Sequence, residues 1–251
     1  MSTVAVKASQ LGCQRRSAVQ TYARVAGVLA LLSFVAGGFG EAYIPSKVIV
    51  ATDAAATVEN LKSFDLLFRL GFAGYLVEAC CDISLALIFY VLLKPVQRYV
   101  SLLAAFFGLI GTATFAAAEL FYFAPTLALR GAGSLRSFSP DQLNSLALLS
   151  FKLFGVGAAA FTVFYGVAWA LRGYLMYQSG YFPKFLGILM TLAGFAFIGS
   201  NFAVVLAPGY RSGWFLVLML PGLLLLIVWL LVKGVDLARW EEKRTGSGVD
   251  L

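Results

Sequence analysis

Five ionisable or amide side chains stand inside long apolar runs of this sequence. Glu78 and Asp82 lie one helical turn apart in one run, and three further runs contain Glu119, Lys152 and Asn201. Such a group is costly inside a membrane unless it is paired, protonated or in contact with a water-filled path, so it often marks an ion or proton pathway. The chemistry that these residues suggest is therefore proton transfer or cation binding.

Other site chemistries find little support in the residues. The sequence has no histidine, which excludes histidine-ligated haem and removes the commonest general base near neutral pH. Its three cysteines, Cys13 and the adjacent Cys80 and Cys81, lack the spacing of a metal site or a disulfide framework. We find no catalytic triad motif and no phosphate-binding glycine loop. The cofactor stays open, and we predict neither a metal site nor a catalytic set.

The composition places these residues in a lipid bilayer. Hydrophobic residues make up 61% of the chain, charged residues 12%, and the mean hydropathy is +0.87, whereas soluble domains have about 45–50% apolar and 25% charged residues. A chain of 251 residues has too little interior to bury that much apolar surface. The net charge of +7 comes from Lys and Arg at the ends of apolar runs, so we expect lipid contacts and no nucleic-acid partner.

Six apolar runs reach the length of about 17–25 residues that a membrane-spanning helix needs. They cover residues 25–44, 66–93, 99–124, 146–171, 185–207 and 213–233. The sequence therefore predicts an all-α polytopic membrane protein, a six-transmembrane-helix bundle with short surface helices in the outer loops. Its parts would be an amino-terminal segment (1–24), a transmembrane domain (25–235) and a tail (236–251).

The distribution of Lys and Arg predicts the orientation. Twelve of the 19 fall in the amino-terminal segment, the second and fourth connections and the tail, and five fall in the other three connections. The twelve are Lys7, Arg15, Arg16, Arg24, Lys94, Arg98, Arg172, Lys184, Lys233, Arg239, Lys243 and Arg244. The five are Lys47, Lys62, Arg130, Arg136 and Arg211. Because Lys and Arg are enriched in the cytoplasmic loops of membrane proteins, both termini are expected in the cytoplasm.

Two outer connections carry signals for helix starts. Thr52 or Asp53 can cap a short helix that lies along the outer membrane surface. Ser139, followed by a proline, can cap the start of the fourth run. These segments either cover a site beneath them or serve only as helix starts.

Asn60 and Arg69 complete, with Asp53, the candidate residues of the outer region. Arg69 lies half a turn around its helix from Glu78, and Asp65 stands four residues before it. We expect Arg69 to pair with Asp65 near the outer surface rather than with the buried carboxyls.

Small and polar residues recur together at helical spacing in four runs. The four stripes are Gly71, Gly74, Glu78, Cys81 and Asp82; Gly108, Gly111, Thr112, Phe115 and Glu119; Lys152, Gly155, Ala159, Thr162 and Gly166; and Gly187, Thr191, Gly194, Ile198 and Asn201. Small faces pack against other helices rather than lipid, so the stripes should converge and bring the polar groups inward.

Two interpretations of this polar set remain open. Glu119, Lys152 and Asn201 fall at a similar depth, with Glu78 near the bilayer centre and Asp82 deeper. They can form a polar path from the outside, or Glu119 and Lys152 can form a buried ion pair while Glu78 is simply protonated. In either case we expect Glu78 or Asp82 to hold a proton at neutral pH.

Several short motifs also resemble a known family. They are Phe39–Tyr43, Thr52–Thr57 with Asn60, Leu67–Gly71, Leu92–Val96, Ser179–Pro183 with Gly187, and Trp229–Val235. In this order they resemble the membrane family called domain of unknown function 4386. The resemblance implies a bacterial inner-membrane protein with several helices and assigns no activity. Phe107-Gly108 and Leu220-Pro221-Gly222 depart from the basic and acidic residues that it implies near these positions.

Three functions are compatible with these observations. The first is a non-enzymatic bundle that binds a small ligand or conducts an ion through the polar set between the second and fifth helices. The alternative is a structural or accessory subunit of a larger membrane complex, whose aromatic and small residues contact pigments, quinone or partner helices. An intramembrane enzyme that uses Glu78 and Asp82 is the third.

Overall fold

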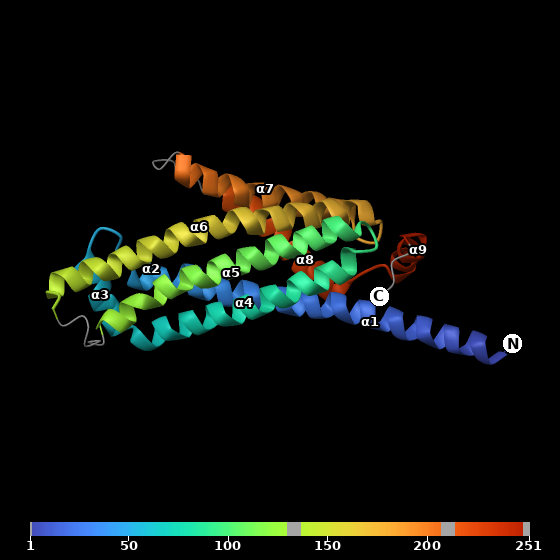
Figure 1. Cartoon of the computed structure of the whole chain (residues 1–251), viewed down its shortest axis with the longest axis horizontal. Coiled ribbons are helices and arrows are strands. Elements are labelled where there is room, and N and C mark those ends of the chain that lie inside the picture. The colour runs from blue at the N-terminus through green and yellow to red at the C-terminus, as the bar shows by residue number, and fades with distance from the viewer. Residues whose placement is uncertain (1, 130–136, 207–213, 248–251) are drawn as a thin grey trace.

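The computed structural model describes residues 2–129, 137–206 and 214–247, and these residues form helices joined by short turns, without a strand (Figure 1). The helices are α1 (Ser2–Gly37), the π-helix η1 (Gly38–Tyr43), α2 (Ile44–Val48), α3 (Ala54–Ser63), α4 (Asp65–Leu93), α5 (Arg98–Leu129), α6 (Pro140–Ser179), α7 (Lys184–Leu206), α8 (Trp214–Val232) and α9 (Leu237–Ser247). The prediction of an all-α protein is confirmed.

The six long helices follow one another around a ring. Each of α1, α4, α5, α6 and α7 packs on the next in this order, and α8 packs on both α7 and α1. Helix α3 lies near one end of the bundle and α9 near the other (Figure 1). We call these the α3 end and the α9 end.

The helices suit a membrane. Among the described residues, five helices are long and apolar enough to cross one, and α8 and α9, which meet at a bend of 98°, make one more span if they are counted together. Large apolar side chains such as Leu66, Val156 and Leu206 are exposed on the bundle, where lipid would favour them. The chain is therefore a polytopic helical membrane protein, as predicted.

Some helices are longer than the apolar runs that predicted them. The first span continues through α1, η1 and α2, from Ser17 to Val48. Helix α6 has 40 residues, which corresponds to a length of about 60 Å, roughly twice the thickness of the hydrocarbon layer. The segment 1–24 is helical over residues 2–24, and residues 237–247 of the tail form α9.

The length of α6 corrects the expected position of Arg172. We expected this residue in the fourth connection, but it lies inside α6 and its side chain is 4% exposed. The expectation was wrong because the fourth apolar run ends before Arg172, whereas the helix continues to Ser179.

The predicted helix starts are confirmed. Asp53 caps α3, where its Oδ1 accepts a hydrogen bond of 2.9 Å from the backbone N–H of Ala56. Ser139 and Gln142 form a reciprocal capping box at the start of α6, with distances of 3.3 and 2.8 Å. These side chains satisfy backbone groups that a helix start leaves without partners.

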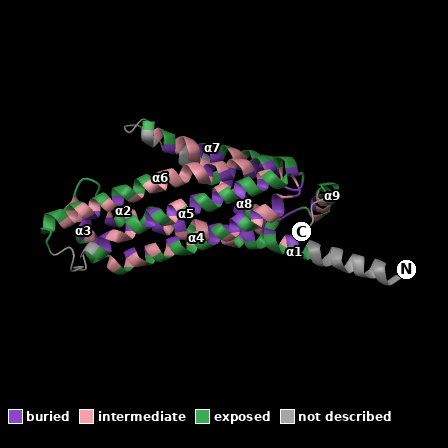
Figure 2. Cartoon of the chain, in the orientation of Figure 1, coloured by how far each residue is buried: buried purple, intermediate pink, exposed green. Residues whose placement is uncertain are grey.

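Buried apolar side chains form two separate clusters (Figure 2 shows burial along the helices). The α9-end cluster includes Ala30, Phe89, Trp169, Met176, Leu230 and Trp240. The α3-end cluster consists of Ile44, Val48, Leu61, Phe68, Tyr75, Phe115, Tyr122 and Phe151. Along α1 and α4, the residues between the two clusters include serine, glutamate and aspartate rather than only apolar side chains.

Helices α6 and α7 approach each other closely at glycines. A Cβ atom on Gly187 would lie 2.5 Å from the backbone N of Tyr177 and 2.7 Å from the carbonyl O of Gly173. A Cβ atom on Gly194 would lie 2.5 Å from the carbonyl O of Gly166. The predicted stripe on α7 is therefore confirmed as a helix-packing face, which is the role that small residues have in membranes.

Candidate functional site

Three carboxyl groups lie within electrostatic range of a fourth, that of Glu78. We call Glu41, Glu78, Asp82 and Glu119 the carboxyl cluster. The carboxyl group of Glu78 lies near enough to the other three to interact with them electrostatically. Glu41 comes from η1, Glu78 and Asp82 from α4, and Glu119 from α5, so the cluster joins three neighbouring segments of the ring.

Two members of the cluster have buried oxygen atoms without partners. A Cβ atom on Gly37 would lie 2.7–2.9 Å from the carboxyl atoms of Glu78, so the glycine makes room for this group. The Oε2 atom of Glu78 and both Oε atoms of Glu119 are buried and have no hydrogen-bond partner among the described residues. Buried polar atoms normally have partners, so these three oxygens call for an explanation.

Asp82, by contrast, has several partners. The Ser33 hydroxyl donates a hydrogen bond of 3.0 Å to Asp82 Oδ1, and the Tyr165 hydroxyl also donates to this carboxyl group. The guanidinium group of Arg172 lies within electrostatic reach and stacks over the ring of Phe89, 5.3 Å from its centroid. Hydrogen-bond donors and a nearby positive charge therefore stabilise the carboxylate of Asp82.

A glycine makes room for Arg172. A Cβ atom on Gly108 of α5 would lie 2.6 Å from a terminal nitrogen of the guanidinium group. Because any larger side chain would displace the guanidinium, Gly108 helps to keep the positive charge near Asp82.

Aromatic rings border the carboxyl cluster toward the α3 end. The rings of Tyr75 and Tyr122 meet edge to face at 5.2 Å, and Phe115 packs against Tyr75 at 5.7 Å. The Tyr75 hydroxyl donates a hydrogen bond of 2.9 Å to the carbonyl O of Gly40, next to Glu41. Aromatic faces attract cations, so this border is compatible with a positively charged ligand.

Comparison with known proteins gives the family. Residues 25–234 match the profile of a family described as a domain of unknown function, DUF4386. The chain belongs to the DUF4386 family. It is similar to an uncharacterised protein of Archaeoglobus fulgidus, with 27% identity over 165 residues, which is 66% of this chain and 84% of that protein. No solved structure matches this DUF4386 protein, so its site must be interpreted from its own geometry.

The structure of this DUF4386 protein does not contain the expected Glu119–Lys152 ion pair. Lys152 is exposed on α6, and neither oxygen of Glu119 has a partner in the described part of the chain. The prediction from the stripe on α6 is wrong at this point, because no other described helix packs on the stripe near Gly155. This glycine is exposed, and an added Cβ there would meet no heavy atom within 4 Å. Lys152 is thus not brought to the carboxyl cluster.

Asn201 joins two helices instead of the cluster. Its side-chain amide donates a hydrogen bond from α7 to the carbonyl O of Ala159 on α6. Of the five polar residues that the sequence singled out, the structure therefore brings together Glu78, Asp82 and Glu119.

The outer candidates of this DUF4386 protein stabilise local structure. Besides the Asp53 cap, the Asn60 amide donates to the carbonyl O of Val48 at 3.4 Å, and Arg69 Nε lies 2.9 Å from Asp65 Oδ2. The Arg69–Asp65 pair is as predicted. These contacts hold α3 and the start of α4.

Sequence reasoning missed Glu41, Tyr165 and Arg172. Glu41 lies in the Phe39–Tyr43 motif that supports the family resemblance, and it stands in a π-helix, a form that is often found at functional sites. An acidic residue inside the first apolar run was the signal available for it. Tyr165 and Arg172 gave no such signal, because a tyrosine and a residue beyond the end of a run are ordinary at such positions.

The cluster is not a compact metal site. Among the described residues, no group of three or more Asp, Glu or Cys side chains is arranged to hold a metal ion. Glu41 is exposed, Glu78 is half-buried, and Asp82 and Glu119 are buried. The cluster thus extends from a residue at the surface of the bundle to buried residues inside it.

Proposed function

We propose that the carboxyl cluster binds a small monovalent cation, which enters beside Glu41 and competes with protons for Glu78 and Glu119. The observation that carries this proposal is the set of buried carboxyl oxygens without partners on these two residues. Carboxyl groups at such positions are stable only when they hold a proton or meet a positive charge.

The balance of charge supports a cation. Arg172 is the buried cation of the described bundle, and it lies beside Asp82. Glu41, Glu78 and Glu119 therefore depend on protons or cations from the solution to balance their negative charge. Protons and a cation are then alternative occupants of the same carboxyls, which is the usual basis of exchange between them.

The packing supports entry beside Glu41. The α9-end cluster is filled with large side chains, including Trp169 and Met176 on either side of Arg172 along α6. Glu41 is the member of the carboxyl cluster whose residue reaches the surface of the bundle, so the proposed entry lies beside it.

Thermal unfolding of the purified protein in detergent tests the proposal. Melting would be followed in NaCl, KCl and choline chloride at equal ionic strength, at pH 6 and pH 9. We expect Na⁺ or K⁺ to raise the Tm relative to choline, by an amount equivalent to about 2.7 kcal/mol at a hundred times the Kd, and more strongly at pH 9, where fewer protons compete.

Matched variants locate the effect. Glu78→Gln and Glu119→Gln should remove the cation-dependent rise in Tm, whereas Glu59→Gln on the exposed face of α3 should keep it. If the wild type shows no difference between the salts at either pH, or if the two Gln variants keep it, the cation site is refuted.

We further propose that both termini face the cytoplasm and that the membrane is the bacterial inner membrane. With Arg172 inside α6, eleven Lys and Arg residues remain on the proposed inner side against five on the outer side; three of the five, Arg130, Arg136 and Arg211, lie outside the described residues. This distribution follows the positive-inside rule.

Cysteine labelling tests the orientation. Single cysteines at Ala55, Ser137, Gln178 and Ser247, all exposed in the structure, would replace the three native ones. An impermeant reagent applied to intact cells should label positions 55 and 137 and spare positions 178 and 247. Labelling of position 247 would contradict the proposed topology.

A role as an accessory subunit of a larger membrane complex is the competing proposal. It has one specific support, an apolar groove of about 280 Å³ between α6 and α7. The groove is lined by Tyr174, Tyr177, Ile188, Thr191, Leu192 and Phe195. Native mass measurement and an absorption spectrum after mild extraction separate the two: large partners or a pigment favour the subunit, and an isolated monomer or dimer favours the cation-binding bundle.

A further inference from the structure

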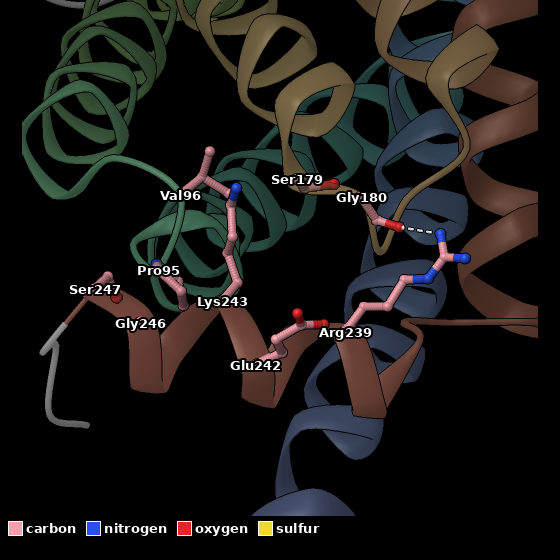
Figure 3. Close-up of a pocket in the computed structure, with 9 residues that line it drawn as sticks. All are labelled: Pro95, Val96, Ser179, Gly180, Arg239, Glu242, Lys243, Gly246 and Ser247. Carbon is pink, nitrogen blue, oxygen red and sulfur yellow. Dashed lines mark hydrogen bonds between the residues drawn. The ribbon is translucent and has the colours of Figure 1, made fainter.

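A second polar site lies at the α9 end of the bundle, and it shares no residue with the carboxyl cluster. A pocket of about 620 Å³ opens between α9, the turn from α4 to α5 and the end of α6 (Figure 3). Its lining residues are Pro95, Val96, Ser179, Gly180, Arg239, Glu242, Lys243, Gly246 and Ser247. The pocket thus joins three separate parts of the chain.

The wall that α9 provides is fixed to the bundle. Trp240 is 1% exposed, and its Nε1–H donates a hydrogen bond of 3.1 Å to the carbonyl O of Leu92. The Tyr181 hydroxyl donates to the same carbonyl at 2.7 Å. Asp236 caps α9 by accepting from the backbone N–H groups of the next helical residues at 3.1 and 3.2 Å. The pocket therefore needs no ligand to hold its shape.

Two cationic residues of α9 line the pocket. Arg239 and Lys243 are one helical turn apart, and the ends of their side chains diverge across the pocket in Figure 3. Figure 3 shows Lys243 extending toward the turn that holds Val96, while Arg239 donates a hydrogen bond of 2.9 Å to the carbonyl O of Gly180. Neither the ion pairs nor the hydrogen bonds of the described residues include the Lys243 ammonium group.

The remaining contacts favour an anion. Arg239 Nε lies 3.6 Å from Asp236 in an exposed pair, which leaves donors of the guanidinium group available. Glu242 also lines the pocket and lowers its charge, so two cations stand against one anion. Guanidinium and ammonium groups are the side chains that proteins use to bind phosphate groups, and this pocket has one of each on its wall.

The position of α9 suggests where the phosphate comes from. The bend of 98° between α8 and α9 directs α9 across the spanning helices rather than along them, and from this direction we infer that α9 lies along the membrane surface. Lys94, Arg98, Lys184 and Lys233 surround the same end of the bundle, and such basic segments attract anionic lipids.

We propose that this pocket binds the phosphate group of an anionic phospholipid, with Arg239 and Lys243 as its ligands. A headgroup there would anchor α9 at the bilayer surface. A soluble phosphate compound offers the same chemistry, so the test includes both sources.

Native mass spectrometry in detergent can measure the binding. Purified full-length protein would be mixed with dioleoyl phosphatidylglycerol or with dioleoyl phosphatidylcholine as the zwitterionic reference. Each basic residue near a membrane surface adds about fivefold to the attraction of an anionic lipid. We expect the wild type to prefer phosphatidylglycerol, and the double variant Arg239→Gln/Lys243→Gln to lose at least about tenfold of this preference.

A matched double variant controls for the loss of charge. Lys184→Gln/Lys233→Gln removes the same number of charges from the same end but leaves the pocket unchanged. It should lose only the general attraction to anionic lipid and keep a clearly larger part of the preference than the pocket variant does. Arg239→Lys should keep part of the preference for phosphatidylglycerol that the pocket double variant loses. The helix content of each variant, measured by circular dichroism, should equal that of the wild type.

The outcomes decide the site and its ligand. Displacement of the lipid by millimolar inorganic phosphate or glycerol phosphate would assign the pocket to a soluble phosphate compound, and no displacement would assign it to the lipid headgroup. Equal losses in the two double variants, or a wild type that does not distinguish the two lipids, would overturn the proposal.

Discussion

Replacement of Gly187 by alanine should destabilise the bundle although it adds a single methyl group. The added Cβ would lie 2.5 Å from the backbone N of Tyr177 and 2.7 Å from the carbonyl O of Gly173. Normal contacts of carbon with these atoms are about 3.5 Å, so α6 and α7 must separate by nearly 1 Å. The atoms belong to the backbone and cannot rotate away.

The expected cost of Gly187→Ala is about 1–3 kcal/mol, the usual range for overpacking of a well-packed interior. Helix propensity acts in the opposite direction, because alanine is favoured over glycine inside a helix by about 1 kcal/mol. A loss of stability would therefore show that the contact dominates.

Gly155 provides the matched control. It lies in the neighbouring helix, and an added Cβ there would meet no heavy atom within 4 Å. Unfolding in mixed micelles of increasing denaturing detergent would measure both variants. Gly187→Ala should be less stable than the wild type and Gly155→Ala equally or more stable. Equal stability of the two variants would refute the close approach of α6 and α7.

Three further predictions concern charge and anchoring. Glu119→Gln should raise the Tm in choline chloride, more at pH 9 than at pH 6, because it removes a buried charge without a partner; a fall at both pH values would contradict this. Arg172→Met should cost about 3–5 kcal/mol in denaturing-detergent titrations, and addition of Asp82→Asn should recover part of the loss; strictly additive losses would show that the two groups are independent. Trp240→Phe should cost about 1–3 kcal/mol and expose α9 to limited proteolysis, because the indole is buried and donates to Leu92; unchanged proteolysis would show that α9 is held by other contacts.

The sequence was sufficient for the features that depend on local signals. The spanning helices, of which the described residues contain five or up to six, follow from apolar run length. The caps at Asp53 and Ser139 follow from side chains that bond to the backbone a few residues away. The Arg69–Asp65 pair is likewise local. Such contacts are within one or two helical turns, so their geometry is known as soon as the helix is.

The candidate site was predicted only in part. Helical periodicity shows which residues share one face of a helix, but it does not show which helix packs on that face. The stripe on α4 correctly placed Glu78 and Asp82 inside the bundle, but the stripe on α6 placed Lys152 there too, where α6 lacks a covering helix. Arg172 was misplaced because a helix can continue after its apolar run ends. Glu41 was missed because the π-helix around it changes which residues share a face.

The glycine contact between α6 and α7 also has a mechanical consequence. From Gly173 to its first residue, Pro140, α6 extends for about 50 Å, and it contacts α3 near that far end. Gly166 and Gly173 both meet backbone atoms of α7, and Asn201 joins α7 to Ala159 further along, so α6 is held to α7 over about four turns. The part of α6 before Ala159 extends beyond this contact for about 28 Å, so a bend of about 5° near Ala159 displaces Pro140 by about 2.5 Å. Arg172 lies inside the held part, so its positive charge stays at Asp82 when the α3 end of α6 moves.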